Sequence, residues 1–191
     1  MPKVKENCGV VGIYSLSGKN VVPMVFDALR ALQHRGQEAW GFAVPNKTPF
    51  KKIGLVSHSS SEFKKIAQEY ASPCVIGHVR YSTMGTSTLE NAQPLKVKDL
   101  CIAHNGTIAN AQELSNLVGG CSFTPQSASD TLVAAQRLVS LISENGDMGK
   151  ALSILKMKWL VRIVLLLSLM TILYMLQETL RIRPMVLDIK I

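Results

Sequence analysis

The sequence has few cysteines, and none of them is arranged as a metal-binding or redox pair. The four cysteines are Cys8, Cys74, Cys101 and Cys121, and no C-x-x-C spacing occurs. The cysteines therefore do not indicate a zinc site. The N-terminus, MPKVKENCGVVGIY, contains no apolar signal region. We expect no secretory targeting, a cytoplasmic location and no disulfide bonds.

The sequence also lacks a basic helix or an aromatic-basic stripe, although its formal net charge is +8. Half of that charge comes from residues 151–191, which hold six Lys or Arg against two acids. The first 150 residues hold 15 basic and 11 acidic residues and are nearly neutral. We therefore expect no nucleic-acid partner.

The 191 residues suffice for one domain with a full core. Short β-branched runs predict strands within 8–15, 40–46, 51–58, 74–83 and 100–110. Apolar spacing predicts helices over 21–36, 60–71 and 127–146, with Gly36 and Gly146 as C-terminal stops. This mixture favours an α+β fold or a layered α/β sandwich.

Cys8, at the start of the first predicted strand, has two interpretations. A lone cysteine is usually a small buried hydrophobe. Alternatively, removal of residues 1–7 would make Cys8 an N-terminal nucleophile, with its own α-amine as the activating base.

Three other positions have a structural and a chemical interpretation each. Arg80 is either a surface residue or a planar fork that binds a carboxylate. Asn105-Gly106 is either a type I′ hairpin turn or an oxyanion hole. Asp130 is either a helix N-cap or an anion that binds an ammonium group. Together with Cys8, the chemical interpretations form a site for an amino acid with a side-chain carbonyl, and glutamine is the obvious candidate.

Several motifs resemble one family, in its order and at about its separations. They are ENCGVVGIY, LQHRGQEAWGFAV, IGHVRYSTMGTS, NAQPL, IAHNGTIANAQEL and SDT. They resemble the class II glutamine amidotransferases, which are N-terminal-nucleophile hydrolases. The resemblance covers Glu6 to about Leu155. It implies a four-layer αββα sandwich with residues 1–7 as a propeptide and 8–191 as the amidotransferase domain.

The resemblance also implies a role for each candidate residue. Cys8 is the nucleophile, Arg80 binds the α-carboxylate of glutamine and Asp130 binds its α-ammonium group. Asn105 and the Gly106 N–H stabilise the oxyanion.

Four further residues take supporting roles by the same resemblance. Arg35 and Gly36 frame the nucleophile, and Tyr81 and Thr83 line the pocket.

HRGQE and HVRYST favour the branch of the family that begins purine synthesis, rather than the sugar-phosphate synthases with YRGYDS and HTRWAT. In that branch ammonia passes to a second domain that binds phosphoribosyl pyrophosphate. That domain, with its Mg²⁺ ligands and in some members a 4Fe–4S cluster, has no counterpart in this sequence. We expect no metal in the fragment, and a homo-oligomer for the full-length protein.

The run WLVRIVLLLSLMTILYML, residues 159–176, is the most apolar part of the chain. Arg162 interrupts it, so we do not predict a membrane span. The resemblance stops near Leu155 and resumes near Ile182. Codons for residues 156–161 and 173–180, read one frame away, allow the family-like NEMVG and LYAARDP.

We therefore hypothesise two compensating frame slips, near Lys156 and Leu180. On this hypothesis residues 156–180 say nothing about the fold, and the sandwich is incomplete at its C-terminal end. A chain translated as printed would expose sheet edges and apolar core, and we expect it to aggregate.

Two alternatives stay open at this stage. The chain could be the glutaminase domain of another class II amidotransferase. It could also be a small membrane-anchored protein that binds a ligand without catalysis, which an unprocessed Cys8 would favour.

Overall fold

A computed structural model of the chain describes residues 8–56, 60–81, 88–106, 108, 110–118, 130–158 and 164–167. The predicted propeptide 1–7, Thr83 and Cys121 lie outside these residues. So does most of the 156–180 segment, apart from 156–158 and 164–167.

The first sheet contains four antiparallel strands in the order β1-β4-β2-β3. They are β1 (Gly9–Tyr14), β4 (Cys74–Arg80), β2 (Ala39–Ala43) and β3 (Phe50–Ile53). Gly9 pairs with Val79, and Ala39 pairs with Arg80. The starts of β1 and β2 therefore meet the end of β4 at one edge of the sheet.

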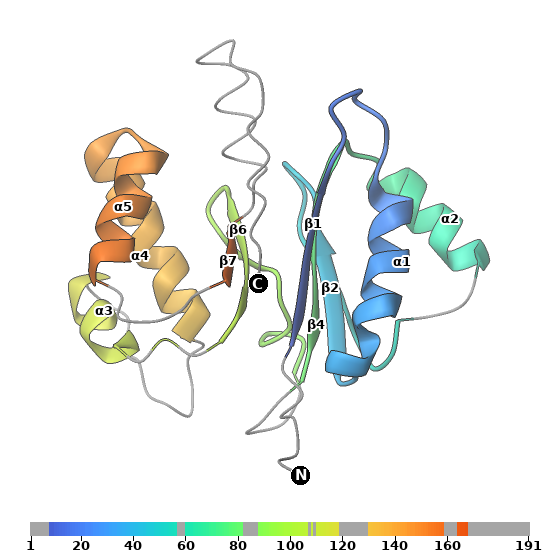
Figure 1. Ribbon diagram of the computed structural model, residues 1–191, viewed down its shortest axis with the longest axis horizontal. Coiled ribbons are helices and arrows are strands. Elements are labelled where there is room, and N and C mark those ends of the chain that lie inside the picture. The colour runs from blue at the N-terminus through green and yellow to red at the C-terminus, as the bar shows by residue number, and fades with distance from the viewer. Residues whose placement is uncertain are drawn as a thin grey trace.

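Helices α1 (Val22–Leu32) and α2 (Ser60–Glu69) cover the outer face of this sheet (Figure 1). The apolar face of α1 is buried because Val22, Val25, Phe26 and Leu29 recur at helical spacing. The Phe26 ring meets Trp40 and Phe42 edge to face, with centroid separations of 5.9 and 5.5 Å. This aromatic cluster forms the first core.

The second sheet has the antiparallel order β5-β6-β7. Its strands are β5 (Leu95–Val97), β6 (Leu100–Asn105) and β7 (Val164–Leu167). Helices α3 (Ala111–Val118), α4 (Asp130–Asn145) and α5 (Met148–Lys158) lie on its outer side (Figure 1). Ile102, Leu114 and Leu138 are among the fully buried side chains of this second core.

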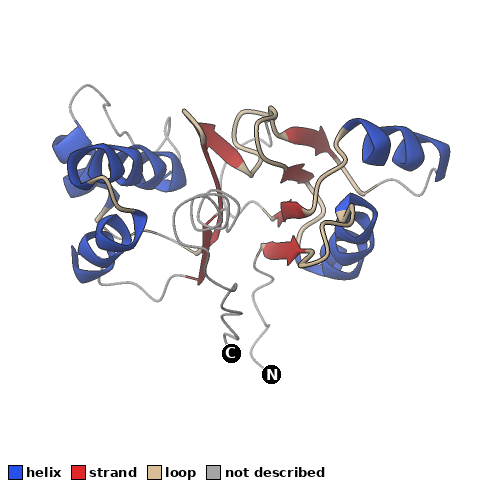
Figure 2. Cartoon of the chain, turned by 90° about the horizontal axis from the view of Figure 1, so that it is seen from above, coloured by secondary structure: helices blue, strands red, loops and turns tan. Residues whose placement is uncertain are grey.

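The two sheets face each other, because β6 contacts both β1 and β4. Seen from above, the layers run helices, sheet, sheet, helices (Figure 2). The αββα architecture implied by the family resemblance is thus confirmed, and it brings the ends of β4 and β6 to the same region as the start of β1.

The predicted glycine stop at Gly36 is wrong. Helix α1 ends at Leu32 and continues as a 3₁₀ turn, η1 (Gln33–Arg35). Gly36 has an extended backbone with φ of −159° rather than the left-handed conformation of a helix stop. A Cβ at Gly36 would lie 2.7 Å from the carbonyl carbons of Val79 and Arg80. Glycine stands here because β4 passes too close for any side chain.

The predicted stop of α4 at Gly146 is confirmed, since Gly146 has φ of +65°. Strand β5 and helices α3 and α5 have no counterpart in the sequence-based prediction. Strand β7 lies inside the 156–180 segment, which we expected to contribute nothing to the fold, yet it pairs with β6. Many short apolar sequences could form a strand that pairs with β6, so this pairing does not test the frame-slip hypothesis, which stays a prediction.

Among the described residues, no helix combines the length and the apolar character needed to cross a bilayer. Most of the apolar run 159–176 lies outside those residues.

Candidate active site

The Cys8 thiol lies against the end of strand β4. The Tyr81 backbone N–H donates a hydrogen bond to the Cys8 sulfur, with an N–S distance of 3.3 Å. The sulfur is also 3.4 Å from the Tyr81 carbonyl oxygen, which can accept the thiol proton. The antiparallel register of β1 and β4 creates this contact.

Two side chains hold the carbonyl oxygen of Cys8. The Asn105 amide, at the end of β6, donates to it at 2.6 Å. The Arg35 Nε, in η1, donates to it at 3.3 Å. The two sheets and η1 therefore converge on the residue predicted to be the nucleophile.

Arg80 is the last residue of β4, directly before Tyr81. Its Nη1 is buried and has no hydrogen-bond partner among the described residues. A buried N–H group without a partner is destabilising by about 1–3 kcal/mol. An anionic group bound at this position would remove that penalty, as expected for a residue that binds a carboxylate.

Asn105-Gly106 does not form the hairpin turn that its sequence also allowed. Strand β6 ends at Asn105, and the next element along the chain is helix α3. Asn105 pairs instead with Val164 of β7. Gly106 has φ of +140°, a conformation that side chains rarely adopt. The hairpin-turn interpretation is therefore wrong, and the oxyanion-hole interpretation stays a prediction.

Asp130 begins helix α4 and connects it to the loop after β6. Its carboxylate accepts the Thr131 N–H at 2.7 Å and the Ile108 N–H at 2.8 Å. The helix-start interpretation thus describes part of its role. An ionised carboxylate has about four acceptor positions, so capacity for an ammonium group is left.

Two buried histidines lie behind these groups. The pKa of His78 is lowered to about 3, mainly by burial and to a smaller extent by the neighbouring Arg80 and His104 side chains. A backbone group of His104 close to the His78 ring raises the pKa and so opposes this shift. The contact falls short of a hydrogen bond by geometry, and neither ring nitrogen of His78 has a hydrogen-bond partner among the described residues. Burial also lowers the pKa of His104, while the Asp130 carboxylate raises it. Both rings are thus favoured in their neutral form.

The structure brings most of the predicted site residues together. Cys8 contacts Arg35, Tyr81 and Asn105 directly. Gly36 packs on the backbone of Arg80. Tyr81 contributes its backbone, and its side chain is 41% exposed. Thr83 lies outside the described residues.

Three polar residues near the site were not singled out from the sequence: Gln93, His104 and Thr131. Each stands in a motif that carries the family resemblance, namely NAQPL, AHNG and SDT. His104 and Thr131 are almost fully buried. A polar residue at a position that the apolar pattern predicts to be buried is expected to have a hydrogen-bond partner, and this signal could have identified them.

The part of the chain that the structure describes contains no group of three or more His, Cys, Asp or Glu able to hold a metal ion. No residues there fit the Mg²⁺ or iron–sulfur groups that the family resemblance implied for a further domain, so we derive no step that uses them.

Comparison with known proteins agrees with this geometry. The profile of the family "Glutamine amidotransferases class-II" matches residues 14–162. Amidophosphoribosyltransferase of Archaeoglobus fulgidus is 40% identical over 76% of this chain and 33% of its own length. That of Methanocaldococcus jannaschii is 39% identical over 76% and 32%. The chain therefore spans about a third of the length of these curated relatives.

Two solved structures give the same result. Glutamine phosphoribosylpyrophosphate amidotransferase of B. subtilis, solved with ADP and GMP, is 30% identical with a TM-score of 0.55. A structure described as the allosteric regulatory enzyme of purine biosynthesis is 32% identical with a TM-score of 0.57. Each match covers 76% of this chain and 32% of the solved one. The fold, the site and these matches agree, and the chain belongs to the class-II glutamine amidotransferase family.

Proposed function

We propose that this chain is the glutaminase part of an amidophosphoribosyltransferase, which hydrolyses glutamine to glutamate and ammonia. The observation that carries the proposal is the convergence on Cys8. The Tyr81 N–H points at its sulfur at 3.3 Å, and the Asn105 amide lies 2.6 Å from its carbonyl oxygen. A nucleophile and an oxyanion donor are thus adjacent, as acyl transfer requires.

In the proposed reaction, removal of residues 1–7 first frees the α-amine of Cys8. The amine takes the thiol proton, and the sulfur attacks the side-chain carbonyl carbon of glutamine. Asn105 and the Gly106 N–H stabilise the resulting oxyanion.

The C–N bond of the tetrahedral intermediate then breaks. The Cys8 ammonium gives its proton to the leaving nitrogen, which departs as ammonia. Water attacks the glutamyl thioester, the C–S bond breaks, and glutamate and the thiol are restored.

Substrate orientation comes from two charged residues. We propose that Arg80 binds the α-carboxylate, which supplies the missing partner of its buried Nη1. Asp130 binds the α-ammonium group through its remaining acceptor positions. Two fixed charges at one end of glutamine place its amide at Cys8.

The fate of the ammonia is a separate proposal, because the chain spans about a third of its relatives. We propose transfer to phosphoribosyl pyrophosphate in a second domain, giving phosphoribosylamine in purine synthesis. A cytoplasmic location, a homo-oligomeric full-length protein, and Mg²⁺ or a 4Fe–4S cluster in that second domain belong to the same proposal.

The first test is hydrolysis by the full chain. We expect release of glutamate and ammonia, together with a mass loss that corresponds to residues 1–7. Cys8→Ala should abolish hydrolysis, while Cys101→Ala, a buried thiol on β6, should retain it. Equal hydrolysis by wild type and Cys8→Ala would refute the proposal. Glutamine binding by an unprocessed, inactive chain would favour a non-catalytic binding protein.

Sequencing the DNA that encodes residues 150–191 tests the frame-slip hypothesis. A continuous frame that contains NEMVG and LYAARDP would support it. A DNA sequence that encodes the printed residues would exclude a sequencing error and leave a gene that is either broken or altered in its purpose.

A further inference from the structure

Three side chains from separate parts of the chain form a cluster behind the oxyanion residues. Gln93 precedes β5, His104 lies in β6, and Thr131 lies in the first turn of α4. The Gln93 Oε1 accepts the His104 backbone N–H at 2.6 Å. The Gln93 amide donates to the Thr131 hydroxyl at 3.4 Å, and the His104 Nδ1 lies 3.2 Å from the same hydroxyl. We call these three residues the Gln93–His104–Thr131 network.

The hydroxyl of Thr131 determines which way the hydrogen bonds run. A hydroxyl has one proton to donate and two lone pairs that accept. Its proton goes to the Asp130 Oδ1, which lies 3.3 Å away. One lone pair accepts from the Gln93 amide. In this arrangement the remaining lone pair accepts, which places the proton on the His104 Nδ1.

The other edge of the His104 ring faces Gly106. The Nε2 is buried and has no partner among the described residues. A Cβ at Gly106 would lie 3.1 Å from this Nε2. The ring is 2% exposed, so it has little freedom to move. It therefore fixes the position of the Gly106 backbone from one side while it bonds to Thr131 on the other.

The network thus joins two parts of the site that lie far apart along the chain. One is Asn105-Gly106, the oxyanion residues, and the other is Asp130, the ammonium-binding residue. They come from β6 and α4, two elements separated along the chain by α3.

We propose that Gln93, His104 and Thr131 are positioning residues, which fix the oxyanion residues relative to Asp130 through a neutral, Nδ1-protonated His104. This inference rests on the proposed glutaminase function. It predicts that loss of the Thr131 hydroxyl impairs both glutamine binding and the chemical step. Protonation of His104 would place a second proton on the partnerless Nε2, which burial disfavours.

The kinetic test compares two variants at position 131 in the full chain. Thr131→Val keeps the shape and removes the hydroxyl, and we expect about a 10-fold rise in KM and about a 10-fold fall in kcat for glutamine hydrolysis. Thr131→Ser restores the hydroxyl and should lie within about 3-fold of wild type. Ser143→Ala is the matched control, since it removes an exposed hydroxyl of the same helix that bonds only to the Val139 carbonyl.

His104→Asn separates the two roles of the histidine. The asparagine amide can still donate to Thr131, but no ring remains beneath Gly106. We expect kcat to fall by about 10-fold with KM nearly unchanged. Equal effects on KM and kcat for all three network variants, with no rescue by Thr131→Ser, would indicate a purely structural role and overturn the proposal.

An NMR measurement tests the network without relying on catalysis. The imidazole ¹⁵N shifts of His104, assigned by their loss in His104→Asn, should report a neutral Nδ1–H tautomer in the wild-type chain. Thr131→Val should shift the tautomer populations, while Ser143→Ala should not. An Nε2–H tautomer in wild type overturns the network. An Nδ1–H tautomer in a chain without glutaminase activity supports the network and refutes the proposed function.

Discussion

At the scale of single residues, Arg80 has the clearest unmet bonding capacity in the site. Its Nη1 is buried without a partner among the described residues, at the end of the strand that contacts the Cys8 thiol. A lysine keeps the charge and loses the planar, two-pronged geometry that matches a carboxylate. We therefore treat the shape of the guanidinium, and not only its charge, as the basis of recognition.

Arg80→Lys should raise the KM for glutamine by roughly 10- to 100-fold and change kcat less, because a charge-assisted pair contributes about 1.5–3 kcal/mol. Steady-state hydrolysis assays measure both constants. Arg137→Lys is the matched control, since Arg137 of α4 pairs with the exposed Glu144. A similar KM for Arg80→Lys and wild type would contradict carboxylate binding by Arg80.

Position 36 requires glycine because there is no room for a side chain, and not because of its backbone conformation. Its added Cβ would lie 2.7 Å from backbone atoms of Val79 and Arg80, which cannot rotate away. The position of the end of β4, which carries Arg80, therefore depends on the absence of a side chain at residue 36.

Gly36→Ala should destabilise the fold by about 1–3 kcal/mol, as forced overpacking does. Urea unfolding measures the change. Gly149→Ala, in the first turn of α5, is the control and should change stability by less than about 1 kcal/mol, because its Cβ would meet the end of the Asp147 side chain at 3.2 Å rather than backbone. A Gly36→Ala variant as stable as wild type would show that β4 can retreat.

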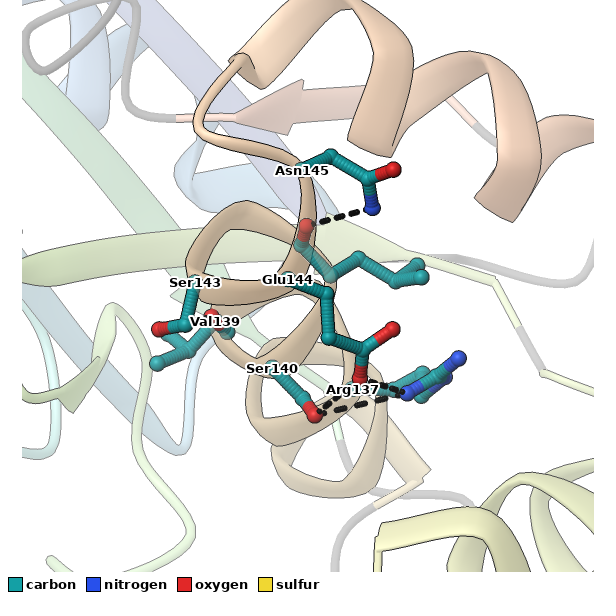
Figure 3. A network of polar contacts seen from close by, with 7 residues as sticks. Arg137, Val139, Ser140, Ser143, Glu144 and Asn145 are labelled. Carbon is teal, nitrogen blue, oxygen red and sulfur yellow. Dashed lines mark hydrogen bonds and ion pairs between the residues drawn. The ribbon is translucent and has the colours of Figure 1, made fainter.

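At the scale of elements, helix α4 carries the site residue Asp130 at its start, while a separate set of polar contacts stabilises its other end. On its exposed side the Arg137 guanidinium donates to Glu144 at 2.9 Å and to Ser140 at 3.3 Å (Figure 3). The Asn145 amide bonds to the Leu141 carbonyl at 2.8 Å. The Gly146 N–H bonds to the Ile142 carbonyl, also at 2.8 Å. The Gly146 bond satisfies one of the last four carbonyls, which the helix end would otherwise leave free.

Gly146→Ala should cost about 1–2 kcal/mol of stability, because φ of +65° disfavours a side chain even though open space surrounds the position. Thermal unfolding is the measurement. Gly146→Asn should be milder, since asparagine tolerates this conformation. Glutamine hydrolysis by either variant should match wild type, and reduced hydrolysis would show that the far end of α4 influences Asp130.

At the scale of the whole molecule, the two sheets bury polar groups between them. His78 on β4 is fully buried, and the titratable groups that face it are Arg80 and His104. The unfolded chain binds a proton at His78 near pH 6.5, whereas in the folded protein its pKa is about 3. The unfolded state therefore binds more protons between these values, and stability falls as the pH drops through this window.

Below pH 6.5, His78 alone should reduce the free energy of unfolding by up to about 1.4 kcal/mol per pH unit. His104 adds to the effect, since burial lowers its pKa in the same direction. Urea unfolding between pH 7 and 4.5 measures the slope for wild type and His78→Leu. The variant should show a shallower slope, and an unchanged slope would contradict the assignment.

The extent to which sequence predicted this molecule differs between its two halves. The strands of the first sheet and helix α1 were predictable because local apolar periodicity and burial coincide there. The catalytic set followed from motifs that resemble a family. Gln93 could not be assigned, because its partners, the His104 backbone and Thr131, are defined only when β6 packs on α4. Gly36 was misread for the same reason, since its neighbour β4 is distant in sequence.

The two hydrogen bonds on the Cys8 carbonyl have a consequence for how the protein becomes active. Asn105 and Arg35 both hold an atom on the carboxyl side of Cys8, and the Tyr81 N–H holds its side chain. Breaking the peptide bond before Cys8 removes none of these contacts. If residues 1–7 are removed as we propose, the thiol therefore occupies its position before its α-amine exists. Maturation would then be a chemical change at a single bond within surroundings that are already assembled.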